Sequence, residues 1–112
     1  MNEISWKDFE LVELRSWTII EVDYFPEARK PAYKITVDFW ESIWIKKTSA
    51  QITDLYNKED LISKQIIWVI NFPKKQIGNF MSEFLLTWFV QKDNSVILAV
   101  PDKKLSNWIK LS

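Results

Sequence analysis

The 112-residue sequence contains no cysteine and no histidine, and it has a single glycine, Gly78. The absence of thiols and imidazoles excludes disulfides, zinc sites of the usual kind, and nucleophilic sites of the Cys-His or Ser-His-Asp type. The carboxylates and lysines that remain are not grouped in any pattern typical of a catalytic set. We therefore expect no enzymatic activity, no metal site and no cofactor.

Long apolar segments are also missing. The longest, "QIIWVINF" and "EFLLTWFV", are far shorter than the ~20 residues that a membrane-spanning helix needs. The start of the chain, "MNEISWKDF", lacks the basic region and apolar stretch of a signal peptide. We therefore expect a cytoplasmic protein without membrane insertion, and the length fits a single domain over residues 1–112.

Positive and negative charges balance over the whole chain but are unevenly distributed along it. The formal net charge is zero, yet residues 1–27 carry seven acids against two bases, whereas residues 28–112 carry thirteen bases against eight acids. Basic residues occur in pairs, which are Arg29-Lys30, Lys46-Lys47, Lys74-Lys75 and Lys103-Lys104. A neutral chain cannot bind nucleic acid through its bulk charge, so any such binding must use a local patch and be salt-sensitive. The alternative, ordinary solvated lysines, is favoured by composition alone.

Alternating apolar and polar residues, many of them β-branched, predict a chain made mostly of strands. In chain order these lie at about 14–24, 33–40, 42–47, 64–72, 81–90 and 94–100, with proline-containing loops at 25–32 and 73–80. Three strands, a short helical connection and further strands is the order of a five-stranded OB-fold barrel, although several small barrels share it. The expected fold is therefore all-β, with short N- and C-terminal extensions.

Two segments carry signals for short helices. Ser5 and Asp8 have the spacing of a capping box, which predicts a helical turn before the first strand. Ser49 and Asn57 are candidate N-caps for one or two short helices within residues 50–63. The expected helix therefore lies between the third and fourth strands.

Longer motifs indicate a family. The stretches "FPEARKPAYK", "SAQIT", "NFPKKQIGNFMSEFLL" and "NWIKLS" resemble the CsaA-type family of stand-alone tRNA-binding domains, which are similar to modules appended to methionyl-tRNA synthetase and to the EMAP-II-type cytokine precursor. The resemblance covers about residues 5–112. It implies an OB-fold core, a homodimer formed through the terminal extensions, and non-enzymatic binding of the outer shape of tRNA.

Candidate tRNA-binding residues follow from the resemblance and from the reach of cations to phosphates. They are the basic and short polar side chains of these motifs, namely Arg29, Lys30, Lys34, Lys46, Lys47, Ser49, Gln51, Asn71, Lys74, Lys75 and Ser82. Purely structural roles, as a helix cap for Ser49 and a turn residue for Asn71, are equally compatible with the sequence. Glu83 is expected to pair with a lysine or a backbone donor. Core or dimer contacts, rather than base stacking, are expected for Phe72, Phe80, Phe84 and Phe89.

Two other functional interpretations stay open. The family is also described as an export-related chaperone, which would hold unfolded polypeptides in apolar grooves of the dimer. A domain split from a synthetase would need a partner chain, and the coincidence of the chain ends with the family's boundaries speaks against it.

The tryptophans depart from the family pattern. Six of the seven stand where the family has glycine or a small residue, and they are Trp17, Trp40, Trp44, Trp68, Trp88 and Trp108. Where such a glycine has a positive φ, a larger residue costs roughly 1–2 kcal/mol. Our hypothesis is that UGA codons that the cell reads as glycine have been translated as tryptophan. The competing interpretation is a stacking platform for single-stranded nucleic acid.

Overall fold

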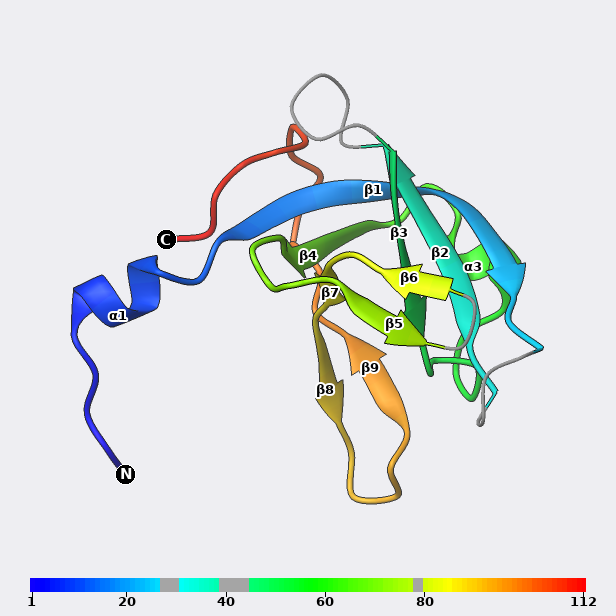
Figure 1. Ribbon diagram of the computed structural model, residues 1–112, viewed down its shortest axis with the longest axis horizontal. Coiled ribbons are helices and arrows are strands. Elements are labelled where there is room, and N and C mark those ends of the chain that lie inside the picture. Colours follow the sequence, from blue (N-terminus) through cyan, green and yellow to red (C-terminus); the bar gives the residue numbers. More distant parts are fainter. Residues whose placement is uncertain (27–30, 39–44, 78–79) are drawn as a thin grey trace.

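The computed structural model describes residues 1–26, 31–38, 45–77 and 80–112, and it shows a mostly β protein with little helix (Figure 1). In chain order the elements are α1 (Trp6–Glu10), β1 (Leu14–Tyr24), β2 (Tyr33–Asp38), β3 (Ile45–Ala50), α3 (Lys58–Leu61), β4 (Gln65–Val69), β5 (Lys75–Ile77), β6 (Phe80–Ser82), β7 (Leu85–Leu86), β8 (Trp88–Val90) and β9 (Val96–Leu98). The predicted first strand has the bounds of β1, and the predicted helix between the third and fourth strands is α3.

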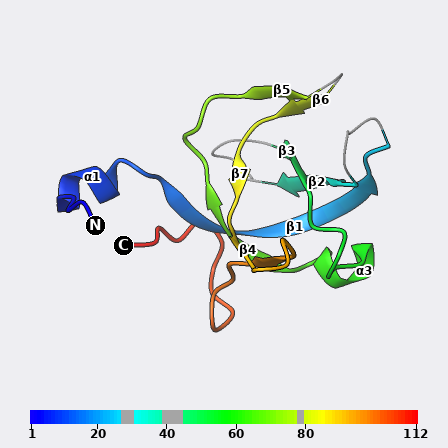
Figure 2. The same ribbon diagram turned by 90° about the horizontal axis from the view of Figure 1, so that it is seen from below.

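The long strand β1 organises the main sheet, whose strand order is β3-β2-β1-β4-β7. Its first half pairs with β4 and its second half with β2, and the register with β2 shifts between Ile19 and Glu21. Such an irregularity bends a strand and increases its twist. The sheet therefore curls into a half-barrel around one face of β1 (Figures 1 and 2). Two small hairpins, β5–β6 and β8–β9, complete the β structure.

The core lies inside the curl of this sheet. Its most deeply buried side chains come from five strands, α3 and the segment after β3, and they are Ile19, Ile35, Val37, Thr48, Ile52, Leu61, Ile66, Trp68 and Leu86. The ring of Trp68 packs edge-on against Phe84 at a centroid distance of 4.9 Å, and its indole N–H donates to the Trp17 carbonyl at 3.2 Å. A buried indole needs such an acceptor, and here it has one.

The described helices α1 and α3 each follow a polar N-cap residue. The Ser5 hydroxyl accepts from the Asp8 N–H at 3.2 Å, and the Asp8 carboxylate accepts from the Ser5 N–H at 3.0 Å, which confirms the predicted capping box. Asn57 precedes α3 in the same way, with its N–H bonded to the Asp60 carboxylate at 3.0 Å. The prediction of Ser49 as a helix cap is wrong, because this residue lies within β3.

The segment from residue 73 to residue 90 also differs from prediction. The expected loop at 73–80 contains β5 and the start of its partner β6, and the expected single strand at 81–90 is divided into β6, β7 and β8. The division at Thr87 has a clear cause: its N–H donates to Ile67 in β4, whereas its carbonyl accepts from Ala99 beyond β9. The chain thus leaves the main sheet there and pairs with β9.

The C-terminal segment folds back along β1. The Trp108 N–H donates to the Ser16 carbonyl at 2.7 Å, and Lys110 forms an isolated bridge with Arg15. The C-terminus therefore lies near the start of β1, whereas α1 stands away from the sheet (Figure 1). Within the described segments, neither helix is long and apolar enough to cross a membrane.

Candidate nucleic-acid interface

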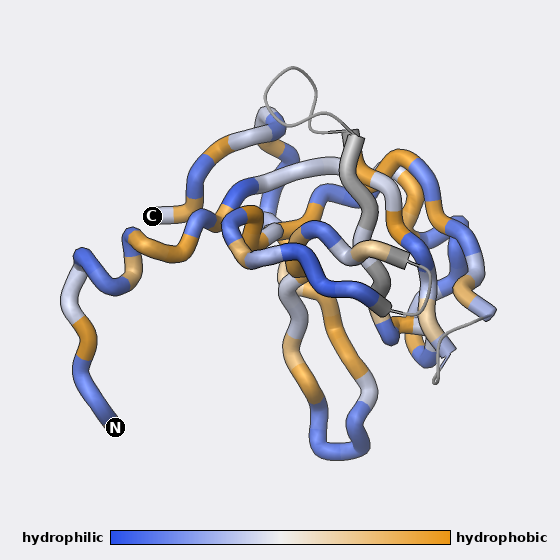
Figure 3. Tube along the Cα trace, viewed as in Figure 1, coloured by the Kyte–Doolittle hydropathy of each residue, from blue (hydrophilic) through white to orange (hydrophobic). Residues whose placement is uncertain are grey.

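The exposed hairpin β5–β6 carries the best-defined part of the predicted site. Lys75 lies opposite Ser82 in its ladder, and Lys74 directly precedes β5. Figure 3 shows β5 as one of the most hydrophilic segments of the chain. Lys75 is exposed and forms no ion pair with any residue in the described ranges. Its charge is therefore available to a ligand.

Lys74 has an acidic neighbour in the same region. Its ammonium lies 3.8 Å from the Glu83 carboxylate, which confirms the prediction that Glu83 pairs with a lysine. The Lys74 side chain is 61% exposed, so this ion pair is weak and easily exchanged. An incoming phosphate can therefore compete with Glu83 for Lys74.

The hydroxyl groups of Thr48 and Ser82 connect β6 to the main sheet. The buried Thr48 hydroxyl donates to the Phe84 carbonyl at 2.7 Å and lies 2.8 Å from the Ser82 hydroxyl. Since Thr48 has one hydroxyl proton and uses it on Phe84, Ser82 must be the donor in the second bond. Toward RNA, Ser82 can therefore act only as an acceptor, for example from a ribose 2′-hydroxyl.

The strands β2 and β3 carry further predicted residues. In their ladder Lys34 lies opposite Ser49, and Lys47 and Lys46 lie opposite Thr36 and Val37. The Lys34 ammonium sits 4.9 Å from the Phe25 ring centroid. Through Thr48, β3 contacts β6, so the structure brings β3 and the β5–β6 hairpin together. Gln51 follows β3 and is exposed.

Two predicted cations, Arg29 and Lys30, lie outside the described residues. Asn71 lies within them, but both ends of its amide bond to the chain before β1. Its nitrogen donates to the Leu11 carbonyl at 2.7 Å, and its oxygen accepts from the Glu13 N–H at 3.0 Å. Asn71 thus fixes the linker after α1, a role that sequence alone could not show because its partners lie about 60 residues away in the chain.

Beside the lysines lies an apolar hollow of about 450 Å³. It is lined by Phe72, Pro73, Lys74, Lys75, Ser82, Phe84 and Leu85. Phe84 belongs to the core, as predicted, whereas the Phe72 side chain is 52% exposed. Phe89 is also exposed, on β8, and the side chain of Phe80 lies outside the described set. The hollow therefore combines an exposed ring with two cations.

Of the six tryptophans that depart from the family pattern, the four that the structure describes do not form an exposed stacking platform. Trp17 and Trp68 are buried, and Trp88 and Trp108 are half-buried against the core. Among these, Trp108 alone has a positive φ, 73°, so the backbone argument for glycine applies to it and not to the strand positions. Trp40 and Trp44 lie outside the described residues. The decoding hypothesis stays a prediction, and among these four positions the backbone argument for glycine applies at Trp108.

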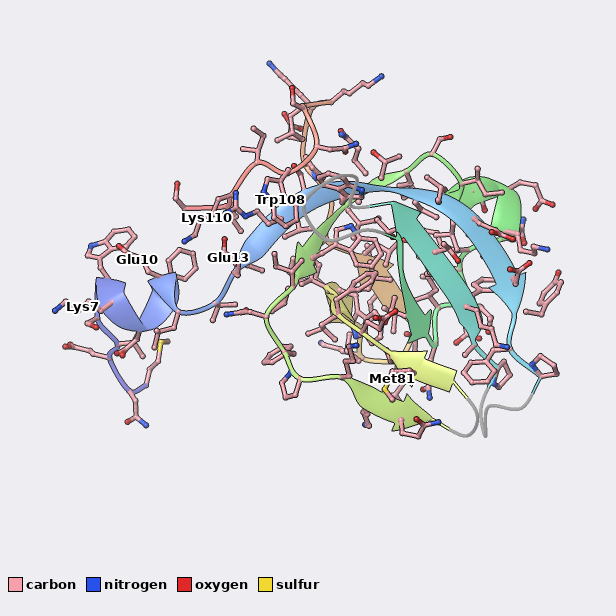
Figure 4. All side chains as sticks on the ribbon, turned by 45° about the horizontal axis from the view of Figure 1, so that its top comes forward. Lys7, Glu10, Glu13, Met81, Trp108 and Lys110 are labelled. Carbon is pink, nitrogen blue, oxygen red and sulfur yellow. The ribbon has the colours of Figure 1, made fainter. Side chains whose placement is uncertain are left out.

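A second cluster of charged side chains, formed by Glu13, Arg15 and Lys110, connects the N-terminal and C-terminal parts of the chain. The Arg15 guanidinium donates to the Glu13 carboxylate at 2.9 Å, and the Lys110 ammonium lies 3.5 Å from the same group. Figure 4 shows Glu13, Trp108 and Lys110 together near the start of β1. The hydrogen bond from Arg15, reinforced by the charges of Arg15 and Lys110, lowers the pKa of Glu13. These two cations are engaged in holding the termini.

Comparison with known proteins gives a consistent set of relatives. No protein-family model matches the chain. The crystal structure of the chaperone CsaA from Bacillus anthracis is 40% identical with a TM-score of 0.90, covering 99% of this chain and 100% of that one. The CsaA chaperone from Picrophilus torridus is 44% identical with a TM-score of 0.89, covering 98% and 100%.

Parts of larger proteins are also similar. The methionine–tRNA ligase of Pyrococcus horikoshii is 30% identical over 105 residues, which is 94% of this chain but 14% of the ligase. The ligase of Nanoarchaeum equitans is 31% identical over 103 residues, or 92% of this chain and 13% of the ligase. A related structure from Pyrococcus horikoshii shares the fold at 19% identity, with a TM-score of 0.85. The chain thus spans a small fraction of the ligases it resembles.

Proposed function

Since the chain belongs to the CsaA family, whose fold it shares and which is related to part of methionyl-tRNA ligases, we propose that it is a non-enzymatic, cytoplasmic tRNA-binding protein. The observation that carries the proposal is Lys75, an exposed cation without a carboxylate partner in the described ranges, beside the weakly paired Lys74. Lysines act as point charges on phosphates and read no base sequence. Recognition therefore rests on the shape of tRNA.

The neighbouring groups suit RNA better than a simple polyanion. The exposed Phe72 ring in the hollow offers a face for an unpaired base, and Ser82 offers an acceptor for a ribose hydroxyl. We propose that the predicted cations of β2 and β3, which are Lys34, Lys46 and Lys47, belong to the same RNA-binding surface. Arg29, Lys30, Ser49 and Gln51 are proposed to join it through the family motifs, whereas Asn71 contributes indirectly through the linker.

The proposal includes a homodimer. No residue of α1 is buried, and Trp6 and Leu11 expose most of their apolar surface. Ile109 and Leu111 in the C-terminal segment are about half exposed. Apolar surface on both extensions is best explained by contact with a second copy of the chain. Sedimentation of Trp6→Glu, expected as a monomer beside a dimeric wild type, tests this part.

The second candidate function is that of a chaperone, because both similar solved structures are of chaperones. The apolar hollow at Phe72 and Leu85, with the exposed Met81 nearby on β6 (Figure 4), could hold an apolar peptide segment. Peptide holding should tolerate salt, whereas phosphate binding should not. A salt-titrated tRNA mobility shift on wild type and on the double variant Lys74→Glu, Lys75→Glu therefore separates the two functions.

A further inference from the structure

A separate cavity of about 770 Å³ lies between the start of β4 and the segment 100–107. Figure 2 shows β5 and β6 on one side of β1 and this segment on the other. Its lining shares no residue with the apolar hollow at Phe72. A ligand in this cavity would therefore not compete directly with RNA on the β5–β6 hairpin.

Three lysines line this cavity, and a single acid accompanies them. Lys64 comes from the residue before β4, and Lys103 and Lys104 come from the segment that closes the cavity, next to Asp102. Across the described segments none of the three lysines forms an ion pair. Cations that line one cavity repel one another unless an anion lies between them. The charge of the lining thus favours an anionic ligand.

Two side-chain amides beside the lysines have fixed orientations. Gln65 accepts from the Leu105 N–H at 3.1 Å and donates to the Leu105 carbonyl at 2.6 Å, which sets its oxygen and nitrogen. The same Gln65 nitrogen also lies 3.2 Å from the side-chain amide of Asn107. Because this nitrogen is a donor, the Asn107 atom that faces it must be the amide oxygen. Thr18 donates to this oxygen as well, at 2.8 Å.

This arrangement leaves the amide nitrogen of Asn107 as a donor. Its oxygen accepts two bonds, whereas its nitrogen bonds to no protein group in the described part of the chain. Because the Gln65–Asn107–Thr18 network already exists, the donor needs little reordering to receive a ligand. The lining of the cavity thus includes one amide whose orientation is fixed and three lysines.

We propose that this cavity binds the phosphate group of a nucleotide, either free or within an RNA backbone. Phosphate oxygens are strong acceptors that lysine ammonium groups and amide N–H groups recognise. The inference does not depend on tRNA binding at β5–β6, since it rests on other residues. Its ligand is defined by the phosphate, and the two sources are distinguished by experiment.

The first experiment is an amide-resolved NMR titration of the ¹⁵N-labelled full chain with inorganic phosphate and with adenosine monophosphate. We expect saturable shifts at Lys64, Asn107 and residues 102–106. The decisive variant is Asn107→Asp, which keeps the acceptor for Thr18 and Gln65 but replaces the N–H₂ donor by a negative oxygen. It should weaken phosphate binding about tenfold or more, since hydrogen bonds to charged groups are strong. Lys92→Gln, on the β8–β9 turn, is the matched control and should bind as wild type does.

The second experiment measures tRNA binding by Asn107→Asp in a mobility-shift assay. If the phosphate comes from an RNA backbone, tRNA affinity and its salt dependence both fall; if it comes from a free nucleotide, tRNA affinity is retained while the NMR shifts are lost. Absence of saturable shifts at these residues with both small ligands, together with unchanged tRNA binding, would overturn the inference. Equal shifts in wild type and Asn107→Asp would overturn it as well.

Discussion

The hydroxyl of Thr48 in β3 lies 2.8 Å from the hydroxyl of Ser82 in β6, and it donates at 2.7 Å to the carbonyl of Phe84. This buried contact joins the lysine-bearing hairpin to the main sheet. Thr48 therefore helps to set the position of Lys74 and Lys75 relative to β3.

Thr48→Val should lower the free energy of unfolding by about 1–3 kcal/mol, because it leaves the Phe84 carbonyl and the Ser82 hydroxyl without their partner in a buried place. Ser82→Ala is the matched control and should cost less, since the bond to Phe84 remains. Urea unfolding measures both. Equal stability of wild type and Thr48→Val would contradict this role.

The Glu13 ion pairs should make stability depend on acid. Because the folded-state pKa of Glu13 is lowered from its ordinary 4.5, its contribution is present above about pH 4.5 and is lost as the pH falls through the lower folded-state value. Glu13→Gln should therefore be less stable than wild type at pH 7, and the gap should close below pH 4.5. Thermal unfolding across this range measures it. Glu10→Gln on α1 is the control, and a gap that stays constant to low pH would oppose the assignment.

Trp108 allows backbone strain to be measured separately from side-chain contacts. Its φ of 73° favours glycine, while its ring packs edge-on against Trp17 at 5.4 Å and lies under Arg15 at 4.9 Å. Trp108→Gly and Trp108→Ala remove the same ring, but only glycine relieves the strain. We expect the glycine variant to be more stable than the alanine variant by about 1 kcal/mol in urea unfolding. The reverse order would remove the structural support for glycine at this position.

Trp68, unlike Trp108, is expected to stabilise the fold through its side chain. Its ring is fully buried against Phe84 and its indole N–H has an acceptor, so Trp68→Ala should cost about 3–5 kcal/mol through the cavity it leaves. Denaturant unfolding of this variant beside Trp6→Ala on the exposed α1 is the measurement. A destabilisation no larger than that of Trp6→Ala would indicate that the core closes around a small residue.

Decoding itself is tested on the protein from its own cell. Peptide mass spectrometry of the segments that contain Trp17, Trp68 and Trp108, with the codons sequenced, distinguishes the two residues directly. Glycine masses at UGA codons would support the hypothesis, whereas tryptophan masses or UGG codons at these sites would sink it.

Much of the fold could be predicted because local chemistry specifies it. The alternation of β1, the capping box of Ser5 and Asp8, and the polar start of α3 at Asn57 all lie within a few neighbouring residues. The hairpin β5–β6 could not be predicted in this way, because its strands are short, β5 is mainly polar, and its anchor, Thr48, lies 34 residues before Ser82. The role of Asn71 depends on equally distant partners.

The candidate site, too, could be predicted only in part from the sequence. Its lysines could be named from charge and motifs, but the pairing of Lys74 with Glu83 and the engagement of the Ser82 proton depend on the folded chain. Only part of the basic cavity beyond β1 has a signal in the sequence, the pair Lys103-Lys104. Lys64 is distant along the chain and joins this pair only when the C-terminal segment folds back. Long-range packing, rather than local propensity, places the ligand-binding groups.

tRNA binding by the β5–β6 surface is tested most directly by a mobility-shift titration between about 50 mM and 200 mM salt, with wild type, Lys74→Glu plus Lys75→Glu, and the control Lys7→Glu on α1. Wild type and control should bind tRNA at low salt and weaken steeply as salt rises. The double variant should bind more weakly at low salt, with a salt slope reduced by about 1 for each phosphate that it no longer neutralises. Absence of wild-type binding at about 50 mM salt, or equal binding by the double variant, would contradict the proposal.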